Sequence, residues 1–222
     1  MAEPLNLRLN SALDPQEWAR KYAENPLVQI PAILEPALAE QVSAILRDTL
    51  TWRLVFPEPG PAGDGEEVVV QLTQQDVQRM GREAVSAAIG GVMQRARKNY
   101  GYLYDSYPMI QAYTSHWDPG HPIHRVTEFL NSREFLDFGQ IVTGAPVVTK
   151  ADAQATRYTR GHFLTRHVDE GHDTERVAAS TFSFARNWQP TWDGLLMLLE
   201  GGMEVTRSVV HRSTIPSSFA GL

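Results

Sequence analysis

A chain of 222 residues, with 42% hydrophobic and 21% charged residues, suits one ordinary globular domain with a substantial core. The net charge of −6 disfavours nucleic acid and anionic lipid as partners, and the absence of cysteine excludes disulfides, thiolate catalysis and Cys-ligated zinc. Since the sequence contains neither a signal-peptide pattern nor a membrane-length apolar stretch, we expect a cytoplasmic protein with no nucleic-acid or membrane partner.

Helical patterns dominate residues 1–143. Asp14 followed by Pro15 predicts a helix start, and the longest helical pattern runs from about Gln74 to Lys98, with Thr73 as its N-cap and Gly90-Gly91 as a weak point. We also expect helices over residues 36–47 and 125–138, a strand over 27–30, a loop over 57–65, and an aromatic loop or strand over 100–107.

From residue 144 onward the pattern changes to short β-like runs separated by turn residues. These runs cover residues 146–149, 153–158, 162–168, 177–185 and 195–199. Helices first and strands later predict an α+β chain that forms one domain over residues 1–222. In that domain, helices from residues 1–143 buttress an antiparallel, barrel-like sheet built from residues 144–222.

The triplet His167-Val168-Asp169 carries the most chemical information in the chain. In an extended strand alternate side chains share a face, so His167 and Asp169 project together. Non-haem Fe(II) oxygenases bind their metal with two His and one carboxylate on one octahedral face, and this pair would form two corners of such a site. An isolated His-x-Asp triplet is more often a structural ion pair, so the neighbouring residues decide its interpretation.

The neighbours of this triplet carry a family resemblance. The stretch from Tyr158 through Gly161 and Phe163 to Asp169 resembles the Fe(II)/2-oxoglutarate dioxygenases, specifically the prolyl-4-hydroxylase-like branch. The likeness covers about residues 155–199, where Trp192-Asp-Gly-Leu-Leu stands in place of the Trp-Gly-Gly-x-Leu of relatives. It implies a double-stranded β-helix core (jelly-roll or cupin-like). It also implies an enzyme that couples 2-oxoglutarate decarboxylation by O₂ to hydroxylation of a peptidyl or small-molecule substrate.

The resemblance also implies roles for individual residues. His167 and Asp169 would ligate Fe(II), and the hydroxyl of Tyr158 would bind a carboxylate of the co-substrate 2-oxoglutarate; the alternative for Tyr158 is a core aromatic. Arg176 is expected to pair with an acidic residue near the metal loop, and Ser183 replaces a tyrosine that contacts the co-substrate in some relatives. The remaining expectations are packing roles for Trp188 and Trp192, no ligand role for His162 and His172, and a surface or substrate-facing loop for His116, His121 and His124.

The third iron ligand has no clear place in the sequence. Relatives carry a distal His about two strands after the Trp-Gly-Gly segment, followed by an Arg or Lys that binds the far carboxylate of 2-oxoglutarate. His211 is the only later histidine and comes too early, with Arg212 directly beside it, so it is a candidate third ligand in an atypical position. Because one extra base before His211 would permit a segment close to that of the family, we hypothesise that a frameshift replaced the C-terminal third of the barrel.

These features lead to a prediction about activity and leave two alternatives open. Two ligands hold Fe(II) less securely than three, so we expect weak or absent turnover by this chain. The alternatives are a catalytically inactive binding or scaffold module on the same fold, and a cupin-type protein in which His167 and Asp169 bind Zn or Mn. The substrate and the oligomeric state do not follow from the sequence.

Overall fold

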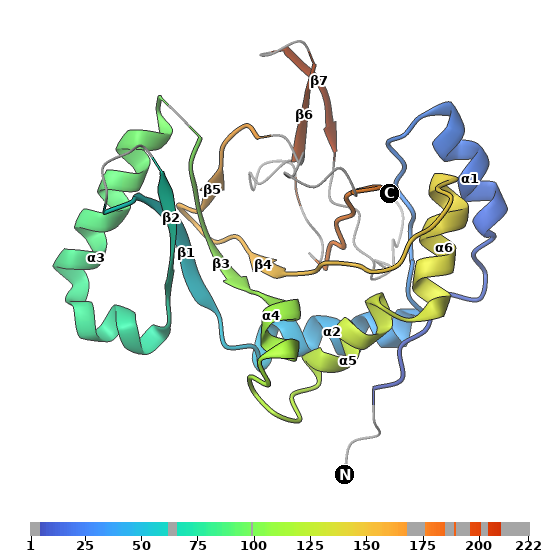
Figure 1. Ribbon diagram of the computed structural model, residues 1–222, viewed down its shortest axis with the longest axis horizontal. Coiled ribbons are helices and arrows are strands. Elements are labelled where there is room, and N and C mark those ends of the chain that lie inside the picture. The colour runs from blue at the N-terminus through green and yellow to red at the C-terminus, as the bar shows by residue number, and fades with distance from the viewer. Residues whose placement is uncertain are drawn as a thin grey trace. The chain divides into compact units, whose positions relative to one another are not determined.

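The computed structural model describes residues 5–61, 66–98, 100–167, 176–184, 189, 196–200 and 204–209. These residues contain six α-helices and seven β-strands, and they confirm the predicted α+β class (Figure 1). The chain divides into two compact units, one made of residues 49–117 and 153–170 and the other of residues 1–48, 118–152 and 171–222. None of the helices described is both long enough and apolar enough to span a membrane.

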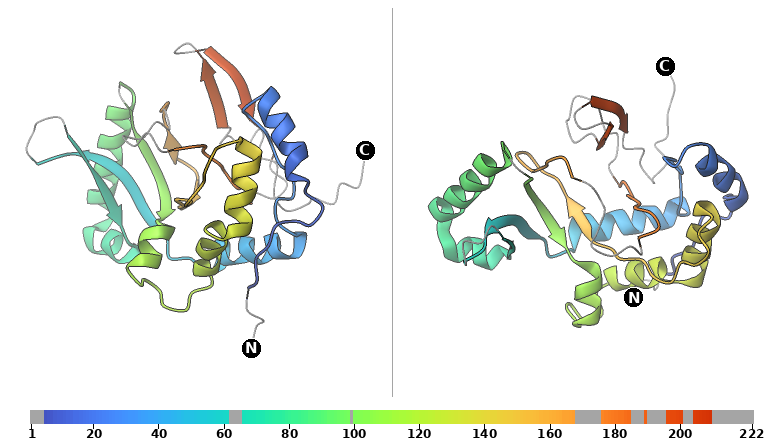
Figure 2. Two further views of the ribbon diagram at one scale, coloured as in Figure 1. Left: turned by 45° about the vertical axis from the view of Figure 1, so that its right-hand side comes forward. Right: turned by 45° about the horizontal axis from the view of Figure 1, so that its top comes forward.

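The unit of residues 49–117 and 153–170 is built on an open antiparallel sheet. Its strands are β1 (Arg53–Pro59), β2 (Glu67–Leu72), β3 (Tyr102–Tyr107), β4 (Ala155–Arg157) and β5 (Phe163–Leu164). The strand order is β2-β1-β3-β4, and β5 pairs with β3 as well. The long helix α3 (Gln74–Ala96) lies against one face of this sheet in each view, and α4 (Met109–Thr114) follows β3 (Figures 1 and 2).

Apolar side chains between the sheet and α3 form the core of this unit. Phe56, Val92 and Leu103 are almost fully buried. The partly buried residues packed against them are Leu54, Val70, Leu72, Ala88, Ile89 and Phe163. Residues paired across neighbouring strands share a face, and Phe56 of β1 lies opposite Val70 of β2 while Leu103 of β3 lies opposite Phe163 of β5. All four strands therefore direct the same side towards α3.

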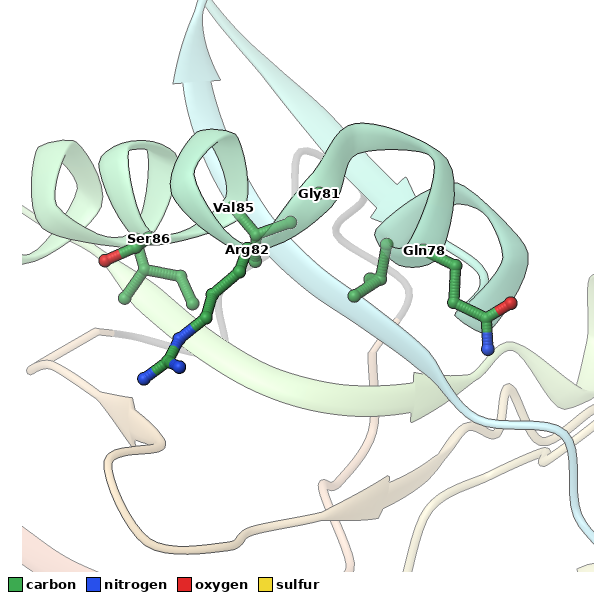
Figure 3. Close-up of a pocket in the computed structure, with 7 residues that line it drawn as sticks. Gln78, Gly81, Arg82, Val85 and Ser86 are labelled. Atoms are coloured by element: carbon green, nitrogen blue, oxygen red, sulfur yellow. The ribbon is translucent and has the colours of Figure 1, made fainter.

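Helix α3 begins where the sequence predicts but bends elsewhere. The Thr73 hydroxyl accepts from the Asp76 amide and the Asp76 carboxylate accepts from the Thr73 amide, which completes a capping box. The bend lies at Gly81, with φ 79° and ψ 159°, whereas the predicted weak point at Gly90-Gly91 is helical. Val92, buried in the core, anchors the helix directly after those two glycines. Figure 3 shows the bend beside a depression of about 450 Å³ lined by Val77, Gln78, Gly81, Arg82, Val85, Ser86 and Ile89.

The other unit contains paired helices and a short strand pair. Its elements are α1 (Pro15–Glu24), α2 (Pro36–Asp48), α5 (Ile123–Leu130), α6 (Arg133–Thr143), β6 (Leu196–Glu200) and β7 (Glu204–Val209). Helix α1 packs against α6 and α2 against α5, and β6 pairs antiparallel with β7 (Figure 1). The Asp14 carboxylate accepts from the Gln16 amide at the start of α1, so the predicted cap is confirmed.

Several expected elements are wrong. The single helix expected over residues 125–138 is two helices, because Ser132 accepts from the Phe135 amide and starts α6 afresh. Residues 27–30, bracketed by Pro26 and Pro31, form no strand, and neither do residues 146–149 and 177–184.

The expected order of helices first and strands later is also wrong. Strands β1, β2 and β3 of the main sheet come from residues 1–143, and β1 continues through Pro59 into the expected loop. The Pro-rich composition of residues 57–61 suggested a loop. A strand tolerates proline, however, where the proline nitrogen faces a side of the strand that has no neighbouring strand.

Candidate metal centre

The residues predicted for the iron site are described only in part. His167 follows β5 and Tyr158 follows β4, so both belong to the sheet unit. Asp169, His211, Trp188 and Trp192 lie outside the described residues. Arg176 and Ser183 are described and belong to the other unit.

Three tyrosines, Tyr104, Tyr102 and Tyr100, connect Tyr158 to His167 through ring contacts. The ring centroids are 5.3 Å apart for Tyr158 and Tyr104, 5.4 Å for Tyr104 and Tyr102, 5.6 Å for Tyr102 and Tyr100, and 6.2 Å for Tyr100 and His167. We call Tyr100, Tyr102, Tyr104 and Tyr158 the tyrosine row. Such tilted ring contacts are favourable beyond the apolar area that they bury.

The strand register explains why the row forms. Tyr102 and Tyr104 alternate with the buried Leu103, so they lie on the sheet face opposite α3. Arg157 of β4 pairs with Asp105 of β3, which brings the next residue, Tyr158, beside Tyr104. Although the alternating tyrosines are visible in the sequence, their contact with Tyr158 depends on a pairing between strands about fifty residues apart.

His167 is held in an orientation that suits a metal ligand. Its Nδ1 lies 3.1 Å from the backbone oxygen of Thr165. A carbonyl oxygen only accepts, so Nδ1 carries the hydrogen and the lone pair of the neutral imidazole is on Nε2. Metal-binding histidines commonly have this second hydrogen bond, which fixes the ring and the tautomer. The residue is exposed, so its imidazole is accessible.

The segment before His167 is fixed to the end of α3 through Gly101. The Thr165 amide donates to the Gly101 carbonyl at 2.9 Å, and the Gly101 amide donates to Thr165 Oγ1 at 2.9 Å, which continues the β3–β5 ladder by one residue. A Cβ at Gly101 would lie 2.7 Å from Cβ of Ala96. Only glycine therefore permits this close approach of strand and helix.

Tyr158 is positioned by the residue before it and by the turn after it. Nε and Nη2 of Arg157 donate to Asp105 Oδ2 at 2.9 and 2.7 Å, and the guanidinium lies over the ring of Trp52. After Tyr158, the His162 amide donates to the Thr159 carbonyl, and His162 Nδ1 accepts from the Thr159 amide. His162 thus has a structural role in this turn.

The phenols of Tyr102, Tyr104 and Tyr158 have raised pKa values. Burial raises the pKa of Tyr102 to about 12, with smaller contributions from Tyr104 and Tyr100. Burial also raises the pKa of Tyr104, partly offset by a hydrogen bond with Gln154. Tyr158 is 46% exposed, and its partial burial raises its pKa as well. Tyr104 and Tyr100 add smaller contributions to this rise. At neutral pH these hydroxyls can therefore donate hydrogen bonds to an anionic ligand.

His121 and His124, near the start of α5, form local hydrogen bonds. His121 Nδ1 accepts from the Ile123 amide at 3.2 Å, and His124 Nε2 lies 3.2 Å from the Asp118 carbonyl oxygen. Across the part of the chain that the structure describes, no three His, Asp or Glu side chains are grouped so that they could hold a metal ion. The described residues therefore contribute one oriented imidazole, His167, to the candidate site.

Comparisons with protein-family models, with curated proteins and with solved structures found no significant match.

Proposed function

We propose that this chain is an Fe(II)- and 2-oxoglutarate-dependent dioxygenase of the prolyl-4-hydroxylase-like type, built on a double-stranded β-helix to which β3, β4 and β5 belong. The observation that carries the proposal is the run of motif residues from Tyr158 to His167-Val-Asp169, in the spacing of that family. The hydrogen-bonded orientation of His167 supports it, because a hydrogen bond from Nδ1 to the Thr165 carbonyl fixes the ring and puts the lone pair of the neutral imidazole on Nε2, as in many metal-binding histidines.

In this proposal His167 and Asp169 hold the iron, and His211 is the candidate third ligand. Fe(II) with 2-oxoglutarate and O₂ supplies the oxidising chemistry when bound. The protein's own contributions are to orient the ligands, to bind the co-substrate and to exclude water. The Tyr158 hydroxyl is protonated at neutral pH, and burial raises its pKa further, so it can donate to a carboxylate of 2-oxoglutarate.

The tyrosine row supports the exclusion of water on the His167 side of the sheet. Tyr102 is 9% exposed and Tyr104 is half-buried, and they fill the sheet face between His167 and Tyr158. A low-polarity wall of this kind strengthens electrostatic interactions at a neighbouring site. Tyr100 and Tyr158, at 45% and 46% exposure, lie at the accessible ends of the row.

The test is release of succinate from 2-oxoglutarate by anaerobically loaded protein after O₂ is admitted. We expect slow release that His167→Ala and Asp169→Ala abolish. The matched control is His116→Asn, because His116 is exposed, lies in the same unit and has φ 56°, a conformation that Asn tolerates. Release that is unchanged in His167→Ala would refute the proposal. Metal binding without any 2-oxoglutarate consumption would indicate the inactive module, and a site that binds Zn or Mn and ignores 2-oxoglutarate would indicate the cupin-type alternative.

A further inference from the structure

Among the strands that the structure describes, β2 forms an open edge of the main sheet. Among the described strands it pairs only with β1 (Figures 1 and 2). Val68 and Val69 in its centre are 43% and 60% exposed. The strand sequence, Glu67-Val-Val-Val-Gln-Leu72, has none of the lysine or proline residues that block edge strands in many proteins.

The prolines of β1 show which backbone groups of β2 are available at this edge. In an antiparallel ladder the residues of a strand alternate between bonding one neighbour and bonding the other. Gly60, an even-numbered residue, donates to the Glu66 carbonyl, whereas the Pro57 carbonyl accepts from Nη2 of Arg95 at 2.9 Å. The backbone groups of even-numbered residues of β1 therefore bond β2. The nitrogens of Pro57 and Pro59, which carry no hydrogen, face away from β2, so the prolines cost no hydrogen bond of this pairing.

The same alternation extends across the pairing to β2. Pro57 lies opposite Val69 and Pro59 opposite Glu67, so these are non-hydrogen-bonded pairs. Glu67, Val69 and Gln71 consequently direct their backbone N–H and C=O groups towards the open edge. Val68 and Val70, opposite Glu58 and Phe56, use theirs within the hairpin.

We propose that this edge binds the same edge of a second copy of the chain, with the two β2 strands antiparallel about a twofold axis at Val69. Such a pair is isologous, so one strand sequence has to complement itself. In this register Val69 meets Val69 of the partner copy and Val68 meets Val70, which matches apolar with apolar. Each outward-directed residue also meets another outward-directed residue, as the ladder requires.

Charge selects this register over its alternatives. Glu67 lies opposite Gln71 of the partner copy at both ends of the pair, so an amide can donate to each carboxylate. A parallel arrangement or a register centred on Glu67 places the two carboxylates side by side, which is unfavourable. Pairing of one six-residue strand buries little area, so the dimer is a weak one that depends on concentration.

Proline substitutions at adjacent positions test the proposal by sedimentation velocity over a concentration series. Val69→Pro removes only an N–H group that faces the open edge, so the urea midpoint should stay that of the wild type. Dimerisation should weaken about tenfold or more, because the two central hydrogen bonds between the copies are lost. Val68→Pro removes an N–H group that β1 uses, so it should lower the urea midpoint. A wild-type chain that is monomeric at every concentration, or a dimer that Val69→Pro leaves intact, overturns the proposal.

Charge variants at an exposed position give a test that is independent of folding. Gln71→Glu puts two carboxylate pairs into the dimer and should weaken it, whereas Gln71→Lys puts a lysine opposite each Glu67 and should strengthen it. Amide exchange in the same concentration series should protect Val69 and Gln71 as the dimer forms, with Val68 and Val70 protected throughout. A shift of both Gln71 variants in the same direction contradicts the register. Protection of the edge by another polypeptide while the chain stays monomeric also overturns the proposal.

Discussion

The close approach of Gly101 to Ala96 gives a sharp prediction about the segment that positions His167. A Cβ at Gly101 would lie 2.7 Å from Cβ and 3.2 Å from Cα of Ala96, well inside ordinary contact distance. The clash cannot be relieved by a side-chain rotation, because Ala96 has no further side-chain atoms to move. Gly101→Ala must therefore shift either the end of α3 or the two hydrogen bonds between Gly101 and Thr165.

The expected magnitude follows from comparable overpacked sites. Gly101→Ala should lower the free energy of unfolding by about 1–3 kcal/mol. The matched control is Gly90→Ala in the same helix, where an added Cβ meets nothing within 4 Å. That control should raise stability by about 0.5–1 kcal/mol, because alanine favours a helix interior.

The assay is urea unfolding followed by tryptophan fluorescence, with a double-mutant cycle. Ala96→Gly removes the atom that clashes, so Ala96→Gly/Gly101→Ala should be more stable than the sum of the two single changes by about 1 kcal/mol or more. A Gly101→Ala variant as stable as the wild type, or a cycle with no coupling, would show that the strand does not approach the helix in this way.

Three further predictions concern the core, the tyrosine row and the helix cap. Phe56→Ala should destabilise the protein by about 3–5 kcal/mol in urea unfolding, because Phe56 is 1% exposed and packs on Leu103; a loss below about 1 kcal/mol would be inconsistent with a core position. Burial raises the pKa of Tyr102 to about 12. The preference of the folded state for the neutral phenol therefore stabilises the protein fully below about pH 10, and this stabilisation is lost as the pH rises towards 12. Tyr102→Phe should reduce this alkaline loss in urea midpoints measured across that range, and an unchanged slope would contradict the assignment. Thr73→Ala should cost about 1 kcal/mol near neutral pH. The hydrogen bond from Thr73 holds the pKa of Asp76 below its usual value, so the deficit should shrink as the pH falls below about 4, and a deficit that is independent of pH would exclude the capping box.

Local signals in the sequence predicted local structure well. Asp14-Pro15 and Thr73 mark the starts of α1 and α3, because a cap needs only a side chain within three residues of the amide that it binds. The hairpin of β1 and β2 was missed because Pro57 and Pro59 favoured a loop. A strand that contains proline can be recognised only when the side of the strand that lacks a neighbouring strand is known.

The candidate site shows the same division between local and non-local information. The spacing from Tyr158 to His167 was available from the sequence, and so was the alternation of Tyr100, Tyr102 and Tyr104. Their assembly into one row requires β3 to pair with both β4 and β5 across more than forty residues of chain. The hydrogen bond between His167 and Thr165, which fixes the imidazole tautomer, is likewise a property of the fold.

Anaerobic titration of the chain with Fe(II), in the presence and absence of 2-oxoglutarate, decides whether His167 and Asp169 bind iron. We expect one weak site per chain that 2-oxoglutarate tightens, that is lost in His167→Ala and in Asp169→Ala, and that persists in His116→Asn. Iron binding that is absent from the wild type, or that survives both ligand substitutions, would contradict the assignment of His167 and Asp169 as an iron-binding pair.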